Sequence, residues 1–128
     1  MTIVLDSGGL SMLVGNRARL AELRRRGEWP AVLPAVVLTE ALTGDHRRDF
    51  HENRLLRTCD VRPVDELLAR EAAALRFKAA TDPRPAAVDA LVAATADVLG
   101  GATVLTGDVG DLRALARHAT HDVVIAPV

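Results

Sequence analysis

Apolar residues along this chain fall into two patterns: short runs that suit buried strands, and longer stretches with a helical repeat. Turn residues follow the short runs, and the longer stretches place apolar side chains three and four residues apart. We predict strands at 2–5, 32–33, 58–64, 102–105 and 123–126. We predict a helical stretch from about residue 10 and helices at 17–26, 34–44, 47–57, 65–80, 86–99 and 111–119. Strands that alternate with helices across short connections predict an α/β fold with a mainly parallel sheet of four to five strands.

Local signals set some of the expected helix boundaries. Gly8 and Gly9 are expected to loosen the chain before the first helix, and Pro34 suits the first turn of the helix at 34–44. Asp65 is a candidate N-cap. The helix that follows it is expected to bury Leu67, Leu68, Ala72, Leu75 and Ala79.

The length and composition favour one ordinary globular domain covering residues 1–128. The chain is 49 % hydrophobic, and it has no apolar run of the ~18 residues that a membrane span needs. The first residues lack the basic segment of a secretory signal, so we expect a cytoplasmic protein. The net charge of −1 neither supports nor excludes a nucleic-acid partner. The single cysteine, Cys59, rules out an internal disulfide, and the four histidines lack zinc-ligand spacing.

Four acidic residues interrupt or end apolar runs. Asp6 and Asp108 follow predicted strands, whereas Glu40 and Asp89 lie near the first turns of predicted helices. A carboxylate beside a core loses hydration unless something compensates, and Mg²⁺ or Mn²⁺ is a suitable partner for such oxygen ligands. The carboxyl ends of parallel strands share one edge of a sheet, so these four residues can converge there.

Each carboxylate also has an ordinary structural explanation. Asp6 and Asp108 suit turns or helix caps, Asp89 suits the positive end of a helix dipole, and Glu40 suits a solvent-facing position. Any one of them alone favours that explanation. The occurrence of all four at one predicted edge favours a metal site.

Four segments carry a family resemblance: Ile3–Ser7 (IVLDS), Val37–Glu40 (VLTE), Val88–Ala96 (VDALVAATA) and Val104–Leu112 (VLTGDVGDL). Together they resemble a PIN domain, most closely the VapC-type ribonuclease toxins of prokaryotic toxin–antitoxin systems. The resemblance implies a three-layer α/β/α sandwich. It implies that Asp6, Glu40, Asp89 and Asp108 are the catalytic, metal-binding acids, with Asp111 as an additional acid.

The resemblance also assigns supporting roles and a chemistry. Ser7 and Thr106 match hydroxyl positions that orient carboxylates or water, whereas Gly8-Gly9 departs from the usual polar–apolar pair. The implied activity is an endoribonuclease that leaves 5′-phosphate and 3′-hydroxyl ends. The implied cofactor is Mg²⁺, with Mn²⁺ able to substitute, and a divalent ion can activate water for phosphodiester hydrolysis.

The partners implied are RNA as substrate, a second copy in a homodimer, and a cognate antitoxin that occupies the site. We expect the antitoxin to place an arginine among the four carboxylates and apolar residues in a groove between the early helices, touching Trp29. The basic runs Arg24–Arg26 and His46–Arg48 are expected to be mainly solvated, with RNA contact as the alternative for both and pairing with an acidic partner as a further alternative for Arg24–Arg26.

Three other functions fit the sequence less well. A phosphatase with Asp6 as nucleophile would need a second acid at position 8, which is glycine. A response-regulator-like phosphoacceptor would need paired early acids and a late lysine, and both are missing. The third alternative is a catalytically silent PIN-like module that only binds a partner.

Overall fold

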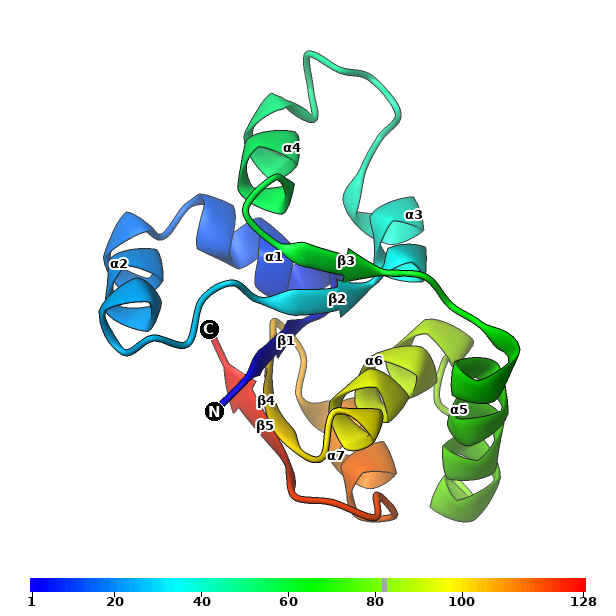
Figure 1. Cartoon of the computed structure of the whole chain (residues 1–128). Helices are drawn as coiled ribbons and strands as arrows, with labels where there is room; N and C mark the ends of the chain where they lie inside the picture. The colour runs from blue at the N-terminus through cyan, green and yellow to red at the C-terminus, as the bar shows by residue number, and fades with distance from the viewer. Residues whose placement is uncertain (82) are drawn as a thin grey trace.

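The computed structural model describes residues 1–81 and 83–128 and contains a five-stranded sheet with helices on both faces (Figure 1). The sheet order is β3-β2-β1-β4-β5, and every neighbouring pair is parallel. The predicted α/β class with a parallel sheet is therefore confirmed. The strands are β1 (Ile3–Leu5), β2 (Val32–Pro34), β3 (Asp60–Arg62), β4 (Ala102–Thr106) and β5 (Val123–Pro127).

The helices form the two outer layers. On one face α1 (Ser7–Val14) packs against β1 and β4, and α2 (Arg17–Arg25) and α4 (Phe50–Leu56) pack against α1. On the other face α6 (Ala87–Val98) contacts β1, β2, β4 and β5. Helices α5 (Glu66–Ala79) and α7 (Gly110–Ala116) pack beside α6, as the lower right of Figure 1 shows.

The core lies on both faces of the central strands. All three residues of β1 are buried, as are Val104 and Leu105 of β4 and Val92–Asp97 of α6. Strands covered on both faces are expected to be continuously apolar, as β1 is. No helix within residues 1–81 and 83–128 combines the length and apolarity that a membrane crossing requires.

The first helix begins earlier than the sequence suggests. Helix α1 starts at Ser7, with Asp6 as its N-cap, so Gly8 and Gly9 lie inside the helix and do not loosen the chain. A β-carbon on Gly9 would lie 2.1 Å from the carbonyl oxygen of Leu105. The glycine therefore allows α1 to approach the backbone of β4.

The predicted helix at 34–44 is wrong at both ends. Pro34 belongs to β2 and is followed by a 3₁₀ turn, η1 (Ala35–Val37), and a short helix, α3 (Leu38–Ala41). Leu42 is extended, with φ −102° and ψ 145°, which ends α3.

Two further expectations about helices are corrected. The helix predicted from residue 47 begins at Phe50, because residues 42–49 form a loop anchored by side chains. Leu67 is 66 % exposed and is not part of the buried face of α5, which is formed by Leu68, Ala72 and Leu75.

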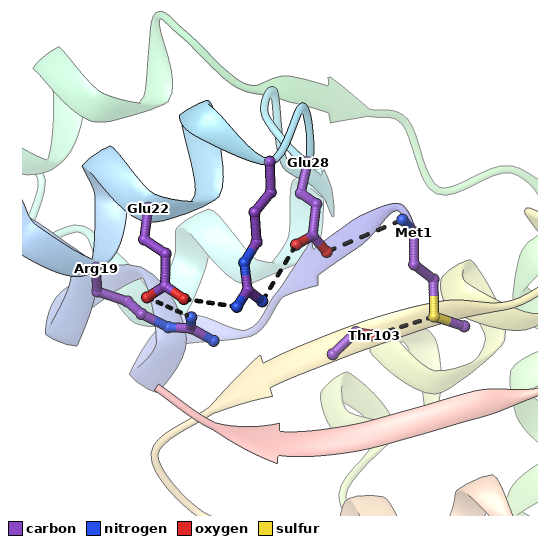
Figure 2. A network of polar contacts seen from close by, with 6 residues as sticks. Met1, Arg19, Glu22, Glu28 and Thr103 are labelled. Carbon is purple, nitrogen blue, oxygen red and sulfur yellow. Dashed lines mark hydrogen bonds and ion pairs between the residues drawn. The ribbon is translucent and has the colours of Figure 1, made fainter.

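A chain of charged side chains joins α2 to the start of β1 (Figure 2). Glu22 accepts from Arg19 at 3.1 Å and from Arg26 at 2.9 Å. Glu28 lies 3.8 Å from Arg26 and 3.9 Å from the amino group of Met1. Exposed pairs of this kind contribute little individually. Arg26 therefore links Glu22 of α2 to Glu28, although its side chain stays 60 % exposed.

Candidate active site

Two of the predicted acids lie where neighbouring strands diverge. Strand β1 pairs with β4 through Leu5 and Leu105, while the chain that leaves β1 returns to the sheet on its other side, as β2. Asp6 and Asp108 follow these two strands. Open α/β sheets bind ligands at such a switch point, beyond the carboxyl ends of the strands.

Asp6 is held rigidly. Its side chain is 8 % exposed, and the backbone N–H of Gly9 donates to Oδ1 at 2.6 Å. The hydroxyl of Thr106 donates to Oδ2 through a short hydrogen bond. Both carboxylate oxygens are therefore oriented before any ligand arrives.

Thr106 links Asp6 to the turn that carries Asp108. The Thr106 hydroxyl oxygen accepts from the backbone N–H of Asp108 at 3.0 Å while its proton is directed at Asp6. The N–H of Gly110 donates to Oδ1 of Asp108 at 3.1 Å. One buried hydroxyl thus fixes the relative position of two acids that are far apart in sequence.

Glu40 reaches the same place from α3, which packs against α1. The hydroxyl of Ser7 donates to Oε1 of Glu40 at a long 3.4 Å. Glu40 is exposed, so this weak contact leaves its side chain free to move. Both predicted hydroxyl residues, Ser7 and Thr106, contact a predicted acid.

Asp89 is located in the first turn of α6 and is half-buried. Burial and, to a smaller extent, the neighbouring charges of Asp6, Asp111, Glu40 and Asp108 together raise its pKa to about 6. The pocket therefore concentrates negative charge that a cation would relieve.

The structure brings all five predicted acids around one pocket of about 250 Å³. Its lining residues are Asp6, Ser7, Gly8, Glu40, Asp89, Gly107, Asp108 and Asp111. Among residues 1–81 and 83–128, no three His, Cys, Asp or Glu side chains are close enough together to hold a metal ion as they stand. Glu40, Asp108 and Asp111 are exposed, so rotation of these side chains is unhindered by packing. The donor set, carboxylates and hydroxyls only, fits Mg²⁺ or Mn²⁺.

Comparison with known proteins shows which fold this is. No protein-family model matches the chain, and no curated protein matches its sequence. A chain of VapBC2 from Rickettsia felis, bound to a promoter DNA fragment, matches with TM-score 0.77 and 11 % identity over 100 % of this chain and 99 % of that one. A chain of DNA-bound VapBC from Salmonella typhimurium matches with TM-score 0.74 and 15 % identity over 99 % and 98 %. FitAcB from Neisseria gonorrhoeae matches with TM-score 0.65 and 24 % identity over 96 % of each chain.

The fold is PIN-like. The similarity to VapC-type proteins expected from the sequence is thus confirmed for the architecture. At these identities the comparison supports the fold, and the chemistry has to be argued from the pocket itself.

Two residues that line the acidic pocket of this PIN-like fold were not expected from the sequence. Gly8 and Gly107 approach each other across the pocket, and a β-carbon on Gly8 would lie 3.1 Å from the Gly107 nitrogen. The sequence did offer a signal for these two residues: Gly8 is two positions after Asp6, and Gly107 directly precedes Asp108.

A second, larger cavity of about 780 Å³ lies between α1, α2 and α4. Buried Leu13 and Leu55 lie at its base, and exposed Arg17, Arg24 and Arg54 surround it. Its lining has no carboxylate, so it suits binding rather than catalysis.

Trp29 is not part of the lining of this cavity. Its indole N–H donates to the hydroxyl of Thr58 at 3.0 Å, and the guanidinium of Arg24 lies 6.0 Å from its ring centroid. Arg24 and Thr58 both line the cavity, so Trp29 contacts two residues of the cavity wall without lining the cavity itself.

Proposed function

We propose that this protein is a divalent-metal-dependent endoribonuclease and the toxin of a toxin–antitoxin pair. The observation that carries this proposal is the gathering of five carboxylates around one pocket at the switch point of the sheet. Asp6 and Asp108 follow β1 and β4, and the other three acids belong to α3, α6 and α7. Structural ion pairs do not explain the cluster, because none of the five acids has a basic partner among the salt bridges of the described residues.

The residues divide into fixed and adjustable groups. Asp6 is fixed by Gly9 and Thr106, so it would give a bound Mg²⁺ or Mn²⁺ a preset ligand. Asp89 and Asp108 would complete the set with Glu40 and Asp111, whose exposed side chains can adjust to the ion and the RNA. When bound, the ion supplies an activated water and offsets charge on the scissile phosphate.

The antitoxin partner is supported by two surfaces and by the structural relatives. The acidic pocket would accept an arginine that takes the place of the cation through a bidentate pair. The cavity between α1, α2 and α4 would accept apolar side chains from the same segment. The solved structures named above are VapBC2, VapBC and FitAcB, and a further match is a toxin–antitoxin complex from Klebsiella pneumoniae. A homodimer remains part of the proposal.

A second candidate is a binding module without catalysis. It is favoured by the finding that no three acids among the described residues are close enough to hold an ion as they stand. In that case the pocket would serve only to receive a basic side chain.

Cleavage of total RNA by the purified protein separates the two. The nuclease should cleave with Mn²⁺ or Mg²⁺, stop when EDTA is added and resume when Mn²⁺ is restored. The products should carry 5′-phosphate and 3′-hydroxyl ends. A protein that binds an antitoxin but yields no metal-dependent cleavage would instead be the silent module.

A further inference from the structure

The connection between α3 and α4 carries a basic, aromatic segment on the same stretch of chain that supplies Glu40 to the acidic pocket. His46, Arg47 and Arg48 are exposed on the loop, and Phe50, the first residue of α4, is 56 % exposed. The sequence pattern alone had favoured a solvated helix start for this basic run. The structure instead shows a projecting loop, at the top of Figure 1.

This loop has a defined conformation. Asp49 is 4 % exposed, and its carboxylate accepts from the N–H and the hydroxyl of Thr43 and from the N–H of Gly44, each at 2.9 Å. At the tip, Oδ1 of Asp45 accepts from the N–H of Arg47 at 2.9 Å. The two aspartates thus hold the basic residues in place while leaving their side chains in solvent.

An exposed aromatic ring follows directly. The rings of Phe50 and His51 meet edge to face, with centroids 5.3 Å apart and planes at 83°. An exposed Phe ring contributes little to the stability of the fold, and this ring lies next to cationic side chains. Aromatic rings beside arginines are the usual means of holding single-stranded RNA, because the ring stacks on a base and the arginines contact phosphates.

The segment is joined to the proposed site by a short length of chain. Leu42 is two residues after Glu40, and Arg47 is seven, a distance of at most about 25 Å along an extended chain. The acidic pocket itself repels a polyanion, and the net charge of the protein is −1. The positive charge that attracts substrate must therefore be local, and this loop carries it on the segment that also supplies Glu40.

We propose that residues 46–51 form a contact site for single-stranded RNA, in which Arg47 and Arg48 bind phosphates and Phe50, braced by His51, stacks on one base. The site deepens the proposed function, on which it rests, by naming the segment that holds the substrate.

The test is fluorescence anisotropy with a labelled, mixed-sequence single-stranded RNA. Ca²⁺ replaces Mn²⁺ in this assay. It can occupy the carboxylate ligands of the pocket while supporting RNA binding better than RNA cleavage. Arg47→Ala with Arg48→Ala should weaken binding about tenfold at low salt and reduce the salt slope by about 1.4, the value for two single-strand phosphate contacts. Lysine at both positions should restore most of the binding, because the contact is to phosphate.

Phe50→Ala should weaken binding at least about fivefold, and Phe50→Trp should restore it. Helix α5 offers matched controls on the opposite layer of the molecule. Arg70→Ala with Lys78→Ala removes the same charge, and Phe77→Ala removes a ring that is even more exposed, at 72 %. These controls should bind RNA like the wild type. In Mn²⁺, the loop variants should raise KM for cleavage with little change in kcat.

Affinities within twofold of wild type for both loop variants would overturn the assignment, as would equal losses in the α5 controls. So would loop variants that bind RNA normally but lose an acidic protein partner. If the loop variants lose RNA binding while the wild type shows no metal-dependent cleavage, the RNA contact stands and the nuclease proposal fails.

Discussion

Asp89 is the carboxylate on which crowding in the acidic pocket has its clearest effect. Its pKa is raised to about 6 by burial and by neighbouring acids, so its charge costs the folded protein stability at neutral pH. Because folding raises this pKa, Asp89 does not lower the free energy of unfolding below about pH 4, where it is protonated in both states. The free energy of unfolding falls as the pH rises through 6 and the folded protein has to carry the charge.

Asp89→Asn should therefore raise the melting temperature of the metal-free protein at pH 7.5. The gain should be on the order of 1 kcal/mol, because solvent screens a half-exposed group. Thermal unfolding in EDTA at pH 4.5 and pH 7.5 measures the difference between variant and wild type. A difference that is the same at both pH values would contradict crowding as its cause.

Thr106 supports a second prediction at this scale. Thr106→Val keeps the shape but removes the hydroxyl that bridges Asp6 and the N–H of Asp108, leaving a buried carboxylate oxygen without a donor. Such a loss costs about 1–3 kcal/mol, which denaturant unfolding would measure.

Strand β4 provides the matched control for that substitution. Thr103→Val removes a hydroxyl that donates only to the sulfur of Met1 and should have little effect. Equal losses in the two variants would show that Thr106 acts as a strand residue rather than as a bridge.

Helix α1 depends on the absence of a side chain at Gly9. A β-carbon there would lie 2.1 Å from the carbonyl oxygen of Leu105, so Gly9→Ala must push α1 away from β4. We expect a loss of about 1–3 kcal/mol together with weaker cleavage, because the backbone N–H of Gly9 also orients the Asp6 carboxylate. Gly15→Ala at the end of the same helix meets no atom closer than 3.9 Å and should be nearly neutral. Similar stability of both variants would contradict the close approach.

The elements that the sequence predicted well are those whose signals are local. Strand β1 is a short apolar run closed by Asp6, and α6 has an almost continuous apolar pattern ended by two glycines. Asp65 caps α5 as expected, accepting from the N–H of Leu68. In each case neighbouring residues carry the whole signal.

The errors arose where tertiary contacts decide the outcome. The start of α4 depends on Asp49 binding the backbone of residues 43–44, and the start of α1 depends on Gly9 fitting against β4. Pro34 was read as a helix start, but the register with Arg62 places it in a strand. Four of the acids could be predicted because each interrupts or ends an apolar run, and Asp111 was implied by the family resemblance. The cavity between α1, α2 and α4 was expected only as a groove, because its walls come from elements distant in sequence.

At the scale of the whole molecule, the two cavities suit one partner that reaches both. An antitoxin segment that anchors in the cavity between α1, α2 and α4 can carry its basic residue to the acidic pocket, because α1 runs from one to the other. Co-expression with the product of the upstream reading frame should give a complex that neither cleaves RNA nor takes up Mn²⁺ as readily as the free protein.

Helix α2 allows a controlled test of that anchor. Ala21 lines the cavity and Ala18 does not, and both are exposed. Ala21→Glu should weaken the complex at least about tenfold, which corresponds to about 1.4 kcal/mol, and Ala18→Glu should leave it unchanged. Equal affinities would place the antitoxin elsewhere.

The most direct test of the central claim is the rate at which defined variants cleave a labelled RNA in Mn²⁺. Asp6→Asn retains the helix cap and nearly the same volume but loses the ligand charge, and Asp89→Asn does the same on α6. Both should cleave at least about a hundredfold more slowly than the wild type. Asp65→Asn, which changes a similar N-cap on α5 outside the pocket, should cleave at the wild-type rate. Undiminished cleavage by Asp6→Asn and Asp89→Asn would contradict a metal-dependent nuclease centred on this pocket.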